Sequence, residues 1–225
     1  YQILARRVGG PEVFERVAIA PPQPGPGEVA IRQTAVGVNF IDVYFRTGLY
    51  PWPPGHENGI VLGSEGAGVV EALGEGVTEF KIGQRVAYGA ARGAFASHRV
   101  VPASALVPLP ESVSDETAAA VMLKGLTAYY LIHHSYAVQK DDWILVHAAA
   151  GGVGQILGPW LKLKGAKGIG TAGGPEKTAL LRDPGYVEAI DSRKAIASSR
   201  RFRSSASARP PGSATLIISL KSRSV

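Results

Sequence analysis

The sequence contains no cysteine among its 225 residues, which excludes disulfide bonds and every thiolate metal site. A zinc site would have to use histidine, aspartate and glutamate alone. The chain also lacks any apolar run near the roughly 20 residues of a membrane-spanning helix. Its N-terminus lacks the basic and then apolar pattern of a signal peptide. We therefore expect a cytoplasmic protein with no membrane partner.

Most of the chain has no excess of charge of either sign. The formal net charge is +6, but the segment from Arg182 to the C-terminus holds nine Lys or Arg against three Asp or Glu and so carries all of it. Because the residues before Arg182 are close to neutral, we expect no basic nucleic-acid-binding face on them. Nucleic-acid binding is expected only through the basic C-terminal segment. With 45% hydrophobic and 19% charged residues, a globular protein of one or two domains is expected.

The first half of the chain consists of short alternating runs separated by glycine and proline. Such runs predict an antiparallel, partly barrel-like β domain over residues 1–112. Acidic and cap residues between Ser112 and Glu116 then precede an apolar segment, which predicts a helix and a domain boundary there. The runs are Glu28–Val38, Glu65–Leu73, Gln84–Ala90 and Phe95–Val101.

A glycine-rich stretch, HAAAGGVG from His147 to Gly154, separates an apolar run from a segment of helical character. Strand, glycine turn and helix in this order open a dinucleotide-binding fold, although such a turn can equally be a plain strand-to-helix connection. We expect Gly151 to permit the tight turn and Gly154 to permit close packing of the helix. The helix is predicted over residues 152–164, although the interior Pro159 opposes it.

A second strand over Gly168–Thr171 and a helix starting near Pro175 are predicted to follow. Beyond Lys194 no sustained period is found, and the bias toward Arg, Ser, Ala and Pro predicts a disordered tail over residues 195–225. The second domain is therefore expected over residues 113–194.

Four motifs in this order resemble the quinone oxidoreductase, or zeta-crystallin-like, branch of the zinc-free medium-chain dehydrogenase/reductase superfamily. The resemblance covers residues 1–193 and implies an α/β protein, with a GroES-like antiparallel β domain followed by a Rossmann domain of doubly wound parallel sheet. It places the nicotinamide of NADPH between the two domains. The motifs are VNFIDVYFRTGLY (Val38–Tyr50), GSEGAGVVEALGEGV (Gly63–Val77), MLKGLTAYYL (Met122–Leu131) and HAAAGGVG.

The resemblance also implies that no metal is used. Zinc-dependent relatives have a cysteine and a histidine where this chain has Asn39 and Ser64. His133 and His134 are adjacent on a predicted helix and face different ways, so they are poorly placed to chelate one ion. We interpret them as surface residues, His56 as a loop residue and His147 as a structural one.

The nucleotide preference follows from the segment after the second strand. Thr171 stands where an NAD-preferring fold has an acid, so a 2′-phosphate is not repelled there. Gly173 and Gly174 leave room for it, and Lys177 can supply positive charge, although a solvated helix lysine is the plain alternative. The resemblance implies a tyrosine near the adenosine at the position of Ser192, so that contact is absent here. The next residue, Arg193, retains a positive charge. The predicted NADPH-binding residues are Lys124, Thr127, Ala150, Gly151, Gly152, Val153, Gly154, Thr171, Gly173, Gly174, Lys177 and Arg193.

By the same resemblance Asn39, Asp42, Tyr44 and Tyr50 border the nicotinamide and the acceptor. The tyrosines can stack on a flat acceptor and donate hydrogen bonds, and Asn39 can orient the ring or a carbonyl. Plain alternatives are a helix cap for Asp42 and edge packing for the tyrosines.

The implied function is that of an enzyme that reduces a small-molecule substrate, a quinone or an enone, with NADPH. A noncatalytic NADPH-binding module and a nucleic-acid-binding regulator stay open. Because the resemblance stops near Pro184 to Lys194, we expect a truncated or frame-shifted product of doubtful activity. The homodimer implied by the family is in doubt for the same reason.

Overall fold

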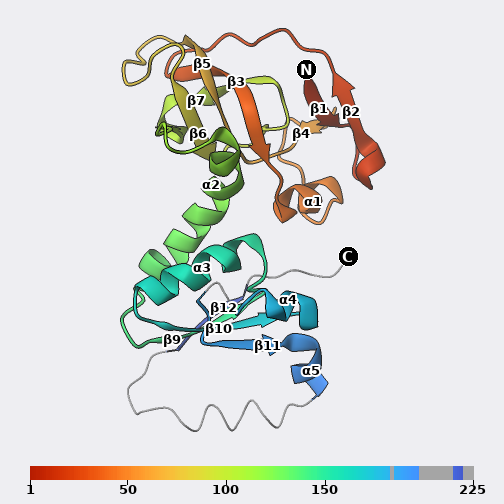
Figure 1. Ribbon diagram of the computed structural model, residues 1–225. Coiled ribbons are helices and arrows are strands. Elements are labelled where there is room, and N and C mark those ends of the chain that lie inside the picture. The colour runs from red at the N-terminus through yellow and green to blue at the C-terminus, as the bar shows by residue number, and fades with distance from the viewer. Residues whose placement is uncertain (183–184, 198–214, 220–225) are drawn as a thin grey trace. The chain divides into compact units, whose positions relative to one another are not determined.

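The structure is a computed structural model that describes residues 1–182, 185–197 and 215–219 (Figure 1). The chain forms two compact units, Tyr1–Leu123 and Lys124–Val225. This division falls inside a helix, whereas the sequence predicts a boundary before it, at residue 112.

The first unit consists of two antiparallel sheets, as its alternating runs predict. Strand order is β7-β3-β5-β6-β8 in the five-stranded sheet and β2-β1-β4 in the three-stranded sheet. The strands are β1 (Gln2–Ala5), β2 (Phe14–Val17), β3 (Glu28–Gly37), β4 (Ile60–Val61), β5 (Glu65–Leu73), β6 (Arg85–Gly89), β7 (His98–Pro102) and β8 (Leu106–Pro108). Short helices are η1 (Pro11–Val13), α1 (Phe40–Arg46) and η2 (Ala103–Ala105).

The core of the five-stranded sheet is made by inward side chains of its strands. Val29 and Ile31 of β3 pack with Val70 of β5 and Val86 of β6, all essentially buried. Burying each such side chain contributes about 1.5–3 kcal/mol. This core holds β3, whose end leads into α1, and β5, whose first residue is Glu65.

The long helix α2 (Asp115–Tyr130) begins on the first unit and continues as a π-helical turn, Leu131–Ser135. The Ser114 hydroxyl accepts the N–H of Thr117 at 3.1 Å and caps the helix. Ala118 packs against Ala67 and Ala87 of the sheet. Because these first turns are buried on the first unit, the division between units falls after Leu123.

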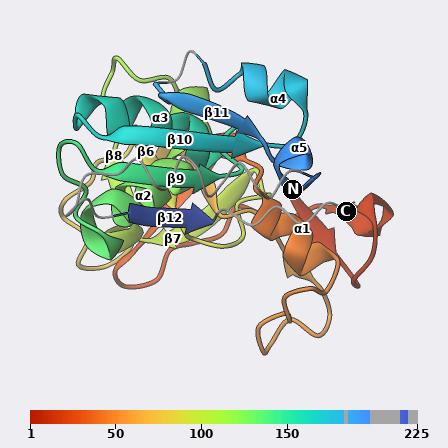
Figure 2. The same ribbon diagram turned by 90° about the horizontal axis from the view of Figure 1, so that it is seen from below.

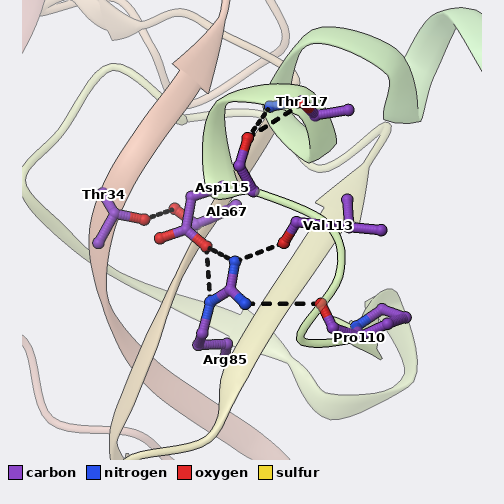
Figure 3. A network of polar contacts seen from close by, with 8 residues as sticks. Thr34, Ala67, Arg85, Pro110, Val113, Asp115 and Thr117 are labelled. Atoms are coloured by element: carbon purple, nitrogen blue, oxygen red, sulfur yellow. Dashed lines mark hydrogen bonds and ion pairs between the residues drawn. The ribbon is translucent and has the colours of Figure 1, made fainter.

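A charged network fixes the start of α2 to β6 (Figure 3). The Arg85 guanidinium donates to Asp115 Oδ1 from Nε at 2.9 Å and from Nη2 at 2.6 Å, and also to the Val113 carbonyl at 2.6 Å. Partial burial raises the pKa of Asp115, but the Thr34 hydroxyl and the Arg85 guanidinium lower it by more, so the pKa lies below its usual value.

The second unit is built on a parallel sheet of order β11-β10-β9-β12. Numbered within the unit this is 3-2-1-4, the order of the first four strands of a Rossmann sheet, which confirms the predicted fold class. Figure 2 shows β9 flanked by β10 and β12. The elements are β9 (Trp143–His147), α3 (Gly152–Leu163), β10 (Lys167–Ala172), α4 (Pro175–Ala179), β11 (Glu188–Asp191), α5 (Ser192–Ala197) and β12 (Thr215–Ser219).

Strand β12 is not predicted by the sequence pattern. The prediction of a tail without regular structure over residues 195–225 is wrong for residues 195–197, which end α5, and for Thr215–Ser219. These residues pair in parallel with β9, from Thr215 opposite Trp143 to Ser219 opposite His147. A strand buried in a parallel sheet is a short apolar run without alternation. The run LIISL is isolated among polar residues, so the sequence pattern does not distinguish it as a strand. Predictions for residues 198–214 and 220–225 lie outside the described residues.

The helix α3 passes through Pro159 without ending, and it stops one residue before the predicted end. The proline removes one main-chain hydrogen bond. Leu157 and Leu161 are fully buried on either side of it, so packing on the sheet outweighs that loss.

No helix among the described residues is both long enough and apolar enough to cross a membrane.

We expect Asp115→Asn to lower the free energy of unfolding by about 1 kcal/mol at pH 7, because the partly exposed pair is screened by solvent. A lowered pKa stabilises the folded state above the unfolded value, about pH 3.9, and this stabilisation disappears as pH falls through the folded value. Urea unfolding should therefore show the two proteins converging below about pH 4. Glu15→Gln, which breaks an exposed pair with Arg6, should cost about 0.3 kcal/mol at most. A constant difference across pH would contradict the assignment.

Candidate active site

In the glycine turn after β9, the residue with left-handed backbone is not the predicted Gly151. Ala148 is left-handed, with φ of 52°, whereas Gly151 has φ of −78° and is the N-cap of α3. The tight turn is therefore made at Ala148, at a cost of about 1–2 kcal/mol. The N–H of Gly151 donates to the Ala148 carbonyl at 2.8 Å and closes the turn.

Gly154 has the role that the sequence predicts. A Cβ at this position would clash with the main chain of Ala149, including its carbonyl oxygen. The hydroxyl of the buried Tyr186 donates to the Gly154 carbonyl at 2.6 Å, and burial raises the pKa of Tyr186. Helix α3 is thus held against the turn from both sides, which only glycine permits.

The N-terminus of α3 can receive an anion. Its N-cap, Gly151, makes no side-chain cap hydrogen bond, and the helix has twelve residues, so its first-turn N–H groups and dipole favour negative charge. Lys124 lies over this turn, because a Cβ at Gly152 would come within 2.6 Å of Lys124 Cδ. The turn and an α2 lysine are therefore adjacent.

The other predicted residues of this region are less exposed than Gly151 and Gly152. Ala150 and Val153 are half-buried against the core of the second unit. Thr127 is half-buried on α2, one helical turn after Lys124.

Thr171, one of the predicted NADPH-binding residues, is buried near the end of β10. It is 5% exposed, and its hydroxyl lies 3.0 Å from His147 Nδ1. Its carbonyl accepts the N–H of Ala149 at 2.9 Å. Thr171 and His147 therefore join the ends of β9 and β10, and Thr171 acts as a structural residue.

The loop after β10 gathers three of the predicted residues around a carboxylate. The Arg193 guanidinium lies over Gly173 and Gly174, with Nη1 3.4 Å from the place of a Gly174 Cβ. Asp191 Oδ1 accepts the N–H of Gly174 at 2.9 Å and of Arg193 at 3.0 Å. Lys177 is exposed on α4, within one turn of Gly174.

Sequence reasoning missed Asp191, which ends β11 and lies 17 residues after Gly174, its partner in the structure. The N–H of Gly174 lowers the pKa of Asp191 most, and the N–H of Arg193 and the charges of Lys194 and Arg193 lower it further. Asp191 thus fixes the loop that carries the candidate phosphate contacts.

In the first unit, Asn39 and Asp42 form a capping box at the start of α1. Asp42 is 4% exposed, and its carboxylate accepts the N–H of Asn39 at 2.8 Å and of Gly63 at 3.1 Å. Both oxygens are therefore bound to the main chain. These contacts support the helix-cap alternative, in which Asp42 positions α1.

A fully buried carboxylate that sequence reasoning missed lies next to Asn39. Glu65, the first residue of β5, is 0% exposed. Its Oε1 accepts Asn39 Nδ2 at 2.7 Å and its Oε2 accepts the N–H of Leu123 at 2.7 Å. In the sequence it reads only as the polar start of a strand.

Tyr44 and Tyr50 lie together, with ring centroids 5.3 Å apart. Tyr50 is 44% exposed, and the neighbouring Phe40 is 60% exposed, with its ring 6.3 Å from that of Tyr44. The four predicted residues of this unit therefore gather around α1, where Tyr50 is exposed and Tyr44 half-buried.

The described residues contain no group of three or more His, Asp or Glu arranged to hold a metal ion. His133 and His134 contact the ring of Tyr129, and His133 also contacts Trp160.

Known proteins resemble the chain in both units. Residues 25–111 match the alcohol dehydrogenase GroES-like domain family. A quinone oxidoreductase of Pseudomonas aeruginosa is 51% identical over 184 residues, 81% of this chain and 56% of that protein. The structure of Escherichia coli quinone oxidoreductase complexed with NADPH is 41% identical with a TM-score of 0.85, over 91% of this chain and 62% of that one.

Over both units the chain is thus similar to quinone oxidoreductases of the medium-chain dehydrogenase/reductase superfamily. Another relative, a 2-haloacrylate reductase of a Burkholderia species, is 44% identical over 81% of this chain and 56% of its own length. The chain thus spans just over half the length of the curated relatives that it matches.

In this chain, Gly154→Ala should lower the free energy of unfolding by about 2 kcal/mol or more, because the main chain has to move. Urea unfolding followed by tryptophan fluorescence measures this. Gly125→Ala is the matched control, since a Cβ there meets nothing within 4 Å inside α2 and should stabilise the protein by up to about 1 kcal/mol. Equal effects would show that Gly154 is not needed for close packing.

Proposed function

We propose that this chain carries the pyrophosphate-binding turn and the acceptor-binding residues of an NADPH-dependent oxidoreductase that reduces quinones or conjugated carbonyl compounds. The single observation that carries the proposal is the geometry of the turn. Gly154 lets α3 approach the strand end, its N-terminus lacks a side-chain cap, and Lys124 lies over Gly152. These features fit a pyrophosphate, because the N–H groups and the ammonium group both favour negative charge.

The preference for NADPH is supported by the loop after β10. Gly173 and Gly174 provide space, Arg193 lies over both, and Lys177 is exposed nearby. The cationic groups would bind the 2′-phosphate, whereas Asp191 is engaged by main-chain N–H groups. The related Escherichia coli quinone oxidoreductase has the same nucleotide bound in its structure.

The acceptor would bind beside α1 in the first unit. The half-buried Tyr44 and the exposed Tyr50 offer adjacent rings on which a flat molecule can stack. Their hydroxyls and the amide of Asn39 can donate hydrogen bonds to an oxygen that becomes negative. Bound NADPH would supply two electrons as a hydride from its nicotinamide C4 to the acceptor.

A delocalised oxyanion needs less stabilisation than an alkoxide, so hydrogen bonds from neutral side chains suffice for a quinone or enone. The relatives' names, quinone oxidoreductase and 2-haloacrylate reductase, describe acceptors of this conjugated type. Asn39 and Ser64 stand where zinc-dependent relatives have zinc ligands, which supports a reaction without that metal.

The test is NADPH oxidation followed at the nicotinamide absorbance with a panel of quinones and enones, on this chain and on a full-length relative. We expect this chain to bind NADPH and to oxidise it with at least one quinone. Binding without oxidation by any acceptor would favour a noncatalytic module, and no binding would overturn the proposal.

NADPH should bind more tightly than NADH, and Lys177→Ala should weaken NADPH binding about tenfold while leaving NADH nearly unchanged, because only NADPH has the 2′-phosphate. Quenching of protein fluorescence gives both dissociation constants. Lys162→Ala, which removes an exposed lysine of α3, is the control and should change neither. Equal affinities of the native chain for the two nucleotides would contradict the assignment.

A further inference from the structure

We propose that Glu65 is a positioning residue that fixes the amide of Asn39 as a hydrogen-bond donor to the acceptor molecule. The role of Asn39 toward the acceptor rests on the proposed function. The orientation of the amide rests on the geometry of the first unit alone.

The orientation follows from the chemistry of the partners. A carboxylate accepts hydrogen bonds and donates none, so the group of Asn39 that faces Glu65 Oε1 at 2.7 Å has to be the NH₂ group. The amide oxygen then faces the start of α1, where the capping box with Asp42 uses it. The two ends of the amide are thus distinguished by two different partners.

One hydrogen of Asn39 Nδ2 remains after the bond to Glu65 is made. Within the part of the chain that the structure describes, no contact accounts for this second hydrogen. Asn39 as a residue is half-buried rather than enclosed. A donor in this place can bind an acceptor oxygen as negative charge develops on it.

The carboxylate itself is held firmly. Glu65 is 0% exposed, and its other oxygen accepts the N–H of Leu123 at 2.7 Å. Gly37 makes the space for it, because a Cβ at this position would clash with Glu65 Oε1 and with the Ala119 carbonyl. The end of β3, the start of β5 and helix α2 therefore enclose the carboxylate together.

Neutral glutamine cannot replace Glu65 without a conflict. In Glu65→Gln the new NH₂ group faces either Asn39 Nδ2 or the N–H of Leu123, both of which are donors. The exchange Asn39→Asp with Glu65→Gln resolves this conflict, because the aspartate introduced at position 39 caps α1 and accepts from the glutamine introduced at position 65. The exchanged pair keeps the total charge and the network, but position 39 loses its side-chain N–H groups.

The orientation can be read directly, since Asn39 and Asn58 are the only asparagines in the chain. A protein labelled with ¹⁵N-asparagine shows two side-chain amide pairs. We expect the Asn39 pair, identified by its loss in Asn39→Asp, to have one proton shifted downfield and slow to exchange with solvent. Asn58, which is exposed, serves as the internal reference.

Glu65→Gln should remove the downfield shift of Asn39 and leave Asn58 unchanged. Glu71→Gln, an exposed residue of the same strand, is the matched control and should leave both pairs unchanged. If Glu65→Gln does not fold, the native spectrum still decides. Two equivalent, rapidly exchanging Asn39 protons in the native protein would overturn the orientation.

The catalytic consequence is tested with the exchanged pair. Asn39→Asp with Glu65→Gln should recover the melting temperature lost in each single variant, yet lower kcat about a hundredfold with little change in KM for NADPH. Recovery of both stability and kcat would show that Asn39 only caps α1, and would overturn the donor role. If the native chain reduces no acceptor, the proposed function fails, while the amide spectrum still tests the positioning by Glu65.

Discussion

The second unit depends on one close approach, that of helix α3 to the main chain of the turn after β9. Without a side chain at Gly154, the helix N-terminus can lie directly behind Ala149. Tyr186 fixes that approach by donating to the Gly154 carbonyl. A helix moved outward would carry its N-terminal N–H groups away from the strand end, so close packing and the proposed anion binding both depend on the same missing methyl group.

The first unit is organised around a buried carboxylate in a comparable way. Glu65 accepts donors from α1 and α2 at once, and Gly37 leaves space for it. Burying a charge is costly unless it is hydrogen-bonded, so this position needs both partners. The candidate acceptor residues are thereby held by two helices and a strand.

Much of this organisation is predictable from patterns of residues. Strand β5 has the bounds that the sequence predicts, because alternation and flanking glycines mark its ends. The role of Gly154 follows from its place between a strand and a helix. Such features depend on residues that are close together in the sequence, so a local sequence pattern is enough to predict them.

What is not predictable depends on contacts distant in the sequence. The partners of Glu65 lie 26 and 58 residues away, so no local pattern distinguishes it from a surface acid. Spacing alone assigns Thr171 to a ligand contact, but its hydroxyl faces His147. Strand β12 is hidden because its apolar run has polar surroundings.

A ¹H–¹⁵N correlation spectrum of this chain titrated with NADPH tests the pyrophosphate site most directly. We expect the largest shifts to fall on the main-chain amides of Gly151 to Gly154, with a second group at Gly173 and Gly174. Shifts confined to other parts of the chain, or none at saturating nucleotide, would contradict a pyrophosphate site at the N-terminus of α3.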